Sequence, residues 1–78
     1  MKVYVQDTSN LCFLCEDGRW TKDLSLARVF GSGAEAMLFC VHHIEQPFQL
    51  LVRFSDPQFD IILPGSKGSG GDIFGAPN

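Results

Sequence analysis

The feature that most constrains the fold is a segment of alternating apolar side chains in the second half of the chain. Every second position carries a large apolar residue: Phe48, Leu50, Val52 and Phe54. A period of two is typical of a β-strand, because successive side chains point to opposite faces. Turn residues at 55–58 and a second apolar run at 59–63, ended by Pro64, predict an antiparallel partner strand. The scaffold of this chain is therefore expected to be a sheet.

A helix is predicted immediately before this hairpin, over residues 33–43. Ser32 and Glu35 have the spacing of a capping box, in which each side chain satisfies a backbone N–H at the helix start. Apolar residues recur at helical spacing: Ala36, Met37, Cys40, Val41 and Ile44. Pro47 stops the helix from continuing. We expect the apolar face of this helix to cover one face of the sheet.

The first third of the chain predicts a small antiparallel meander. Val3 and Val5 alternate with more polar neighbours, which favours a strand with one buried face. Residues 11–15 form a second apolar run of strand length, and residues 20–22 are expected to be a short third strand. Asp17-Gly18 lies between them and favours a tight type I′ hairpin turn.

The strands and the helix are segregated along the chain, in the order ββ(β)-α-ββ. This order predicts an α+β two-layer sandwich, with a mainly antiparallel sheet of about four to five strands and one helix on one face. Residues 1–64 are expected to form a single globular domain, because 78 residues are too few for two. Residues 65–78 are rich in glycine and serine, and we expect them to form a flexible C-terminal tail.

Charge and hydropathy argue against several classes of partner. The chain has 6 basic and 9 acidic residues, and its basic residues are scattered. Binding to nucleic acid or to an anionic membrane surface normally needs a cluster of basic residues. No apolar run approaches the ~20 residues of a membrane span, and the N-terminus lacks the apolar core of a signal peptide. We therefore expect a cytoplasmic protein, without nucleic-acid or membrane partners, whose cysteines stay reduced.

Cys12 and Cys15 have the two-residue spacing shared by metal knuckles and redox motifs. Their spacer, Phe13-Leu14, favours a strand instead of a tight turn. In a strand the two side chains would lie on opposite faces with Cα atoms ~10 Å apart, beyond the ~7 Å limit for a disulfide. The two acidic residues that follow also disfavour a thiolate. The expected role of this segment is one strand of a hairpin.

Cys40, His42 and His43 are a second group of residues with chemical potential. Cys40 and His43 are three positions apart on the predicted helix and can share a face. The simpler interpretation buries Cys40 in the core and leaves both histidines at the C-terminal end of the helix, where the dipole favours a cation. We therefore expect no metal and no cofactor. A zinc- or redox-responsive protein using Cys12, Cys15, Cys40 and His43 remains the alternative, although their spacing matches no known ligand signature.

Several motifs resemble a family of small uncharacterised bacterial proteins. These motifs are Tyr4 with Val5-Gln6-Asp7, Gly18-Arg19-Trp20, Ala27 with Phe30, Glu35-Ala36 on the capped helix, and Val52-Arg53-Phe54-Ser55-Asp56-Pro57-Gln58-Phe59-Asp60. The resemblance covers residues 1–63 and involves aromatic, small and turn residues. Because the family has no assigned activity, the resemblance implies no functional residue for this chain.

These observations favour a non-enzymatic protein-interaction or structural module that self-associates or binds another protein. A cysteine–histidine pair without a third orienting group is no catalytic constellation. A single helix leaves the opposite sheet face open, and a homodimer would bury it. The predicted interaction surface comprises Tyr4, Leu51 and Ile62 on that face, together with Leu38 and Phe39 on the helix. A further alternative is a small-ligand binder with its site beside Trp20.

Overall fold

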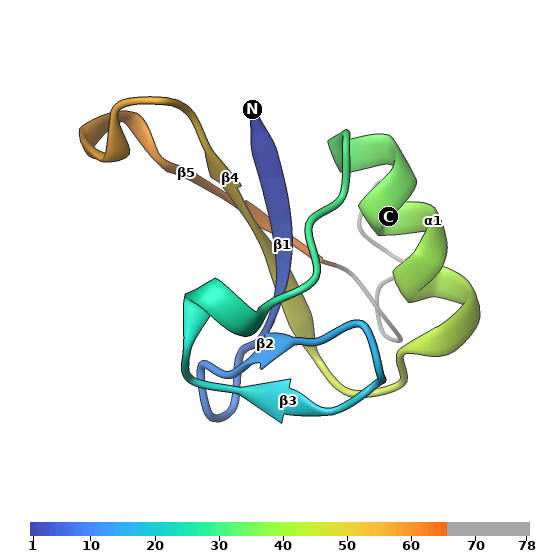
Figure 1. Ribbon diagram of the computed structural model, residues 1–78. Helices are drawn as coiled ribbons and strands as arrows, with labels where there is room; N and C mark the ends of the chain where they lie inside the picture. The colour runs from blue at the N-terminus through green and yellow to red at the C-terminus, as the bar shows by residue number, and fades with distance from the viewer. Residues whose placement is uncertain (66–78) are drawn as a thin grey trace.

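The computed structural model describes residues 1–65, which form one antiparallel sheet covered on one face by a single α-helix (Figure 1). The elements in chain order are β1 (Lys2–Asp7), β2 (Phe13–Leu14), β3 (Trp20–Thr21), the 3-10 helix η1 (Leu24–Leu26), α1 (Gly33–His43), β4 (Phe48–Arg53), the 3-10 helix η2 (Pro57–Phe59) and β5 (Ile61–Pro64). The strands lie in the order β3-β2-β1-β4-β5, and every neighbouring pair is antiparallel. The predicted α+β architecture, with one helix on a sheet of five strands, is confirmed.

β1 is the central strand, and both of its edges are paired. On one edge it runs antiparallel to β4 over its whole length. On the other edge Val3 and Phe30 exchange two backbone hydrogen bonds of 3.2 and 2.8 Å, and Gln6 pairs with Phe13 of β2. The backbone polar groups of β1 are thus used inside the fold, as a buried strand requires.

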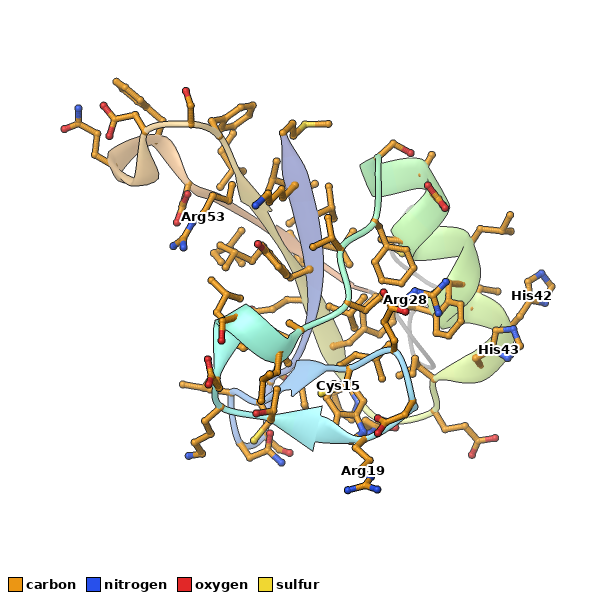
Figure 2. All side chains as sticks on the ribbon, in the orientation of Figure 1. Cys15, Arg19, Arg28, His42, His43 and Arg53 are labelled. Carbon is orange, nitrogen blue, oxygen red and sulfur yellow. The ribbon has the colours of Figure 1, made fainter. Side chains whose placement is uncertain are left out.

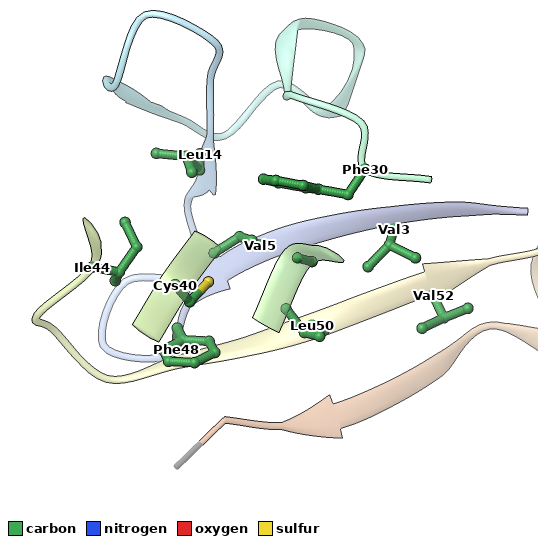
Figure 3. Close-up of a cluster of buried hydrophobic side chains, with 10 residues drawn as sticks. Val3, Val5, Leu14, Phe30, Cys40, Ile44, Phe48, Leu50 and Val52 are labelled. Atoms are coloured by element: carbon green, nitrogen blue, oxygen red, sulfur yellow. The ribbon is translucent and has the colours of Figure 1, made fainter. Parts of the chain in front are cut away.

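The hydrophobic core lies between α1 and the sheet face that it covers (Figure 3). The sheet and the segments beside it contribute Val3, Val5, Leu14, Phe30, Phe48, Leu50 and Val52, and the helix side contributes Ala36, Cys40 and Ile44. The prediction that Val41 belongs to this face is wrong, since its side chain is 53% exposed. α1 makes its main contacts with the sheet on β1 and β4, and the buried members of its stripe are four residues apart.

The helix begins at Gly33, as the capping box predicts, and ends at His43, before Pro47 as expected. The Ser32 hydroxyl accepts a hydrogen bond from the Glu35 N–H at 3.1 Å. The Glu35 carboxylate accepts one in return, at 3.3 Å, from the N–H of Gly31 instead of that of Ser32. Both bonds satisfy backbone donors that have no partner within the helix.

The hairpin that joins β2 to β3 differs from the predicted type I′ turn. Such a turn needs two residues with positive φ, whereas only Gly18 has one here, at 90°. The Gly18 N–H donates to the Cys15 carbonyl at 3.1 Å, and the Cys15 N–H donates to the Arg19 carbonyl at 2.8 Å. The loop therefore has three residues, and the left-handed conformation is left to glycine alone.

Two strands begin two residues later than the sequence predicts. The apolar run 11–15 contributes only Phe13 and Leu14, because Leu11, at φ 63°, closes a turn by donating its N–H to the Asp7 carbonyl. The last strand is Ile61–Pro64 instead of 59–63, because residues 57–59 form η2. In both cases the first residues of the apolar run belong to a turn or a 3-10 helix instead of the strand.

The structure describes only Gly65 of the predicted flexible tail, and residues 66–78 lie outside the described part. Residues 1–65 share the single sheet and core. Within this part, no helix has the length and apolarity needed to cross a membrane.

Candidate functional site

The cysteines and histidines are distributed over separate parts of the fold. Cys40 is fully buried in the core, whereas Cys12 and Cys15 lie half-buried at the two ends of β2. His42 and His43 are exposed on the last turn of α1 (Figure 2). Among residues 1–65, no three His, Cys, Asp or Glu side chains gather closely enough to hold a metal ion. The described residues therefore contain no arrangement of ligands that would support the zinc alternative.

Trp20 lines a hollow at the hairpin of β2 and β3. Cys15, Thr21 and Leu26 lie around it, together with the turn residues 16, 17 and 19. Arg19 forms an ion pair of 3.3 Å with Asp17 across the turn, and both side chains are largely exposed. The hollow gives the small-ligand alternative a location, and its charged rim is already partly neutralised.

The five residues of the predicted interaction surface lie on opposite sides of the molecule. Tyr4, Leu51 and Ile62 form one registered row on the sheet face away from α1, while Leu38 and Phe39 lie on the helix. Tyr4 and Leu51 are only 5% and 9% exposed. The Phe13 ring packs edge-on against Tyr4, with centroids 6.2 Å apart. A partner can therefore contact little of Tyr4 and Leu51, and Ile62 is the accessible member of the row.

Exposure across the sheet rises toward β5, on both faces alike. The fractions for registered neighbours on β1, β4 and β5 are: Val3 0%, Val52 6%, Ile61 45%; Tyr4 5%, Leu51 9%, Ile62 48%; Val5 0%, Leu50 1%, Leu63 40%. The first and third rows face α1, and the second row faces away from it. β5 is thus an apolar strand that the described residues cover incompletely on either face, and this makes it the leading candidate for an interaction site.

The backbone of β5 has one unpaired edge within the described sheet. The Gly65 N–H donates to the Phe48 carbonyl at 3.1 Å, so the residues two and four positions earlier also direct their backbone groups toward β4. Ile62 and Pro64 alternate with them and face outward. Pro64 has no N–H, and it lies at the outward position where an edge strand tolerates proline.

Arg53 and Asp60 form a clamp at the start of this edge. The Arg53 Nη2 lies 2.7 Å from one Asp60 oxygen, and its Nε lies 3.2 Å from the other. This bidentate contact raises the pKa of the Arg53 guanidinium, because the hydrogen bonds to Asp60 favour the charged form. The charge of the Asp60 carboxylate, beside the outward edge, is therefore balanced by Arg53.

A second candidate site, which the sequence patterns do not reveal, surrounds Arg28 beside α1. Its guanidinium lies over the rings of Phe30 and Phe39, and Figure 2 places it on the same side of the molecule as both histidines. Arg28 and Phe30 precede α1 while Phe39 and the histidines lie on it, so the tertiary structure brings the two segments together.

We compared the chain with protein-family models, with curated proteins and with solved structures, and none of the three comparisons returned a match. The resemblance to small bacterial proteins stays a prediction from motifs, and the function has to be argued from the geometry of this chain.

Proposed function

We propose that this protein is a non-enzymatic interaction module that forms a homodimer by pairing the free edge of β5 with β5 of a second copy. The observation that carries the proposal is the rise in exposure from β1 to β5, which leaves Ile61, Ile62 and Leu63 between 40% and 48% exposed. An exposed apolar edge strand is a ready template for another strand.

A two-fold axis through Ile62 gives a self-complementary pairing. Ile62 of each copy would exchange two backbone hydrogen bonds with Ile62 of the other, because its N–H and C=O face outward. Two positions away, each Asp60 N–H would donate to the Pro64 carbonyl of the other copy, while the Asp60 carbonyl would receive no bond in return, because proline has no N–H. Ile61 would lie opposite Leu63, so apolar side chains would meet apolar side chains on the face of the sheet that carries α1.

The charges beside the edge fit a second copy. Native edge strands are often protected from such pairing by lysines or by inward-pointing charges, and β5 carries none. Asp60 is held by Arg53, and in the symmetric pairing it lies across from Pro64 instead of from another carboxylate. Like charges therefore do not oppose each other.

The proposal is tested by sedimentation equilibrium of the full chain over micromolar to millimolar concentration. We expect a reversible monomer–dimer equilibrium that Ile62→Lys shifts to monomer. An unchanged melting temperature of the dilute variant would show that its monomer fold is intact. A wild-type chain that stays monomeric throughout this range would contradict the proposal.

Leu38→Lys is the matched control, because Leu38 is also apolar and is 61% exposed, but lies on α1. This variant should dimerise like the wild type. If Leu38→Lys abolishes the dimer and Ile62→Lys does not, the helix is the interface and the β5 assignment is wrong.

The hollow beside Trp20 supports a second candidate function, small-ligand binding. Trp20 is the only tryptophan in the chain, so its fluorescence reports on this hollow alone. A saturable change in emission during a ligand screen, weakened by Leu26→Ala, would support this function. The absence of any change at millimolar ligand would count against it.

A further inference from the structure

The Arg28 guanidinium is positioned by aromatic rings and not by acceptors. Its central carbon lies 4.7 Å from the Phe30 ring centroid and 4.6 Å from that of Phe39. The two rings are 5.5 Å apart and tilted by 53°, so together they form a cradle. Within residues 1–65, the Arg28 side chain forms neither an ion pair nor a hydrogen bond. Its N–H groups remain available, while stacking on the rings restricts its motion.

The hollow around Arg28 is lined mainly by rings. The His43 ring stacks on Phe39 with centroids 4.5 Å apart, and the His42 ring lies 6.4 Å from that of His43. Glu35 is the one acid that lines the hollow in the described structure, and its carboxylate already accepts the Gly31 N–H. With the histidines counted as neutral, the formal charges of Arg28 and Glu35 cancel here, whereas the whole chain has a net charge of −3.

An apolar wall adjoins the Arg28 guanidinium. Leu38 lines the hollow and is 61% exposed, and the half-buried Phe39 continues the wall beneath Arg28. An anion that carries an apolar group can therefore use both parts of the site at once. A ligand without such a group would leave Leu38 in water and gain nothing from it.

We propose that this hollow binds a carboxylate carried on an apolar or aromatic group. The planar guanidinium of Arg28 matches a carboxylate in a bidentate contact, and its stacked position lowers the entropy lost on binding. A monoanion suits the site better than a dianion, because the Glu35 charge lies on the rim. This site lies beside α1 and is independent of the dimer edge proposed above.

The test is an NMR titration of the full ¹⁵N-labelled chain with phenylacetate and with its neutral isostere phenylacetamide. We expect saturable shifts of amide signals around Arg28 and in α1, with the acid binding about tenfold more tightly than the amide, as expected when a charge-assisted hydrogen bond is lost. Equal affinity for the two compounds would overturn the proposal. Inorganic phosphate that binds as tightly as phenylacetate would overturn the role of the apolar wall.

Two arms of the titration distinguish the possible sources of the carboxylate. N-acetylphenylalanine represents a peptide C-terminus with an apolar last residue, and phenylacetate represents a free organic acid. Tighter binding of either acid than of its own amide supports the site and identifies the preferred source.

Variants assign the binding to particular side chains. Arg28→Gln should weaken phenylacetate binding about tenfold, whereas Arg19→Gln, which removes an exposed arginine at the β2–β3 turn, should leave it unchanged. Leu38→Ala removes an exposed side chain and should weaken binding about threefold without loss of folding. If Arg28→Gln fails to fold, Leu38→Ala and the acid–amide pair still decide. Equal effects of Arg28→Gln and Arg19→Gln would contradict the assignment.

Discussion

β1 and β5 flank the same strand, β4, yet β1 is buried over most of its length whereas every residue of β5 is exposed. Both carry apolar residues on both faces. α1 packs mainly on β1 and β4, and Phe13 covers Tyr4 on the opposite face, whereas the described residues leave the β5 side chains from Ile61 to Leu63 between 40% and 48% exposed. The comparison shows that position in the sheet, and not residue type, sets burial here.

The polar groups of the two strands differ in the same way. β1 has backbone partners along both edges. The side chain of its last residue, Asp7, is hydrogen-bonded to Ser9, and this residue is only 5% exposed. In the described sheet β5 pairs along one edge, and the backbone N–H and C=O of Ile62 point away from β4. A strand like β1 stabilises the single chain, while a strand like β5 has outward backbone groups and exposed apolar side chains that another molecule can contact.

The largest expected effect comes from shortening a leucine on the protected side of this comparison. Leu50 and Leu63 lie opposite each other in the β4–β5 ladder and are 1% and 40% exposed. Leu50→Ala should lower the free energy of unfolding by about 2–4 kcal/mol, because it leaves a cavity in the core. Leu63→Ala should lower it by about 1 kcal/mol or less.

Urea denaturation of dilute protein measures both values. Equal losses in the free energy of unfolding for the two variants would contradict the contrast between β1 and β5, since Leu63 would then be as well covered as Leu50. If β5 pairs with a second copy, the loss caused by Leu63→Ala should grow with protein concentration, whereas dimerisation should not cover Leu50 further.

The next effect concerns the residue that fastens the end of β5 to β4. A Cβ on Gly65 would clash with a ring carbon of Phe48 and would lie 2.5 Å from the Phe48 carbonyl oxygen. Gly65→Ala must therefore displace the backbone that donates to the Phe48 carbonyl, and we expect a loss of about 1–3 kcal/mol.

Gly18→Ala is the control for this glycine, because a Cβ there meets no atom within 4 Å and only the positive φ of 90° opposes it. We expect a loss of about 1 kcal/mol for Gly18→Ala, from backbone strain alone. Thermal unfolding of both variants measures the two losses. A Gly65→Ala protein as stable as the wild type would show that β5 ends without this close contact.

A smaller effect is expected at the end of β1, and it depends on pH. The Ser9 hydroxyl and then the Ser9 N–H, at 2.6 and 2.7 Å, lower the pKa of Asp7 below its ordinary 3.8. The unfolded chain therefore binds the proton more readily. The stabilisation by charged Asp7 is fully present above about pH 5 and disappears as the pH falls through the lowered pKa.

Asp7→Asn should cost about 1 kcal/mol at pH 7, because it replaces charge-assisted hydrogen bonds by weaker ones. The variant should also lose less stability than the wild type between about pH 4 and pH 2. Glu45→Gln, which changes an exposed acid next to α1, serves as the control. Parallel stability–pH curves for wild type and Asp7→Asn would contradict the role of this carboxylate.

The sequence predicts where helices and strands lie along the chain better than it predicts which of them are neighbours in space. The capping pair Ser32 and Glu35 defines α1 because both partners lie within one helical turn. The alternation over residues 48–54 identifies a strand and its two faces, but it contains nothing about which strand lies at an edge. The contrast between Val5 and Leu63 follows from strand order, which is a property of the whole chain.

The candidate sites could be predicted only in part for the same reason. Ile62 is apolar in a strand, so its place on a sheet face could be expected, but its outward backbone groups depend on register with β4. Arg28 has its ring partners 2 and 11 positions away, on separate segments. The type of the turn at Gly18 was also undetermined locally, because an Asp-Gly pair is compatible with two- and three-residue loops.

The smallest effect is expected for Ile62→Thr in dilute, monomeric protein, and it is the sharpest test of β5 as an edge. Threonine keeps the branched shape that suits a strand, so the change removes apolar contact without disturbing the backbone. Ile62 is 48% exposed in the single chain, and we expect a loss of about 0.5 kcal/mol in urea denaturation. Leu51→Ala, at the buried neighbour in the same row, should lose several times more. A loss for Ile62→Thr as large as that for Leu51→Ala, at a concentration where only monomer is present, would mean that β5 is covered within one chain. The dimer edge would then have no free surface, because the contrast between β1 and β5 on which it rests would be absent.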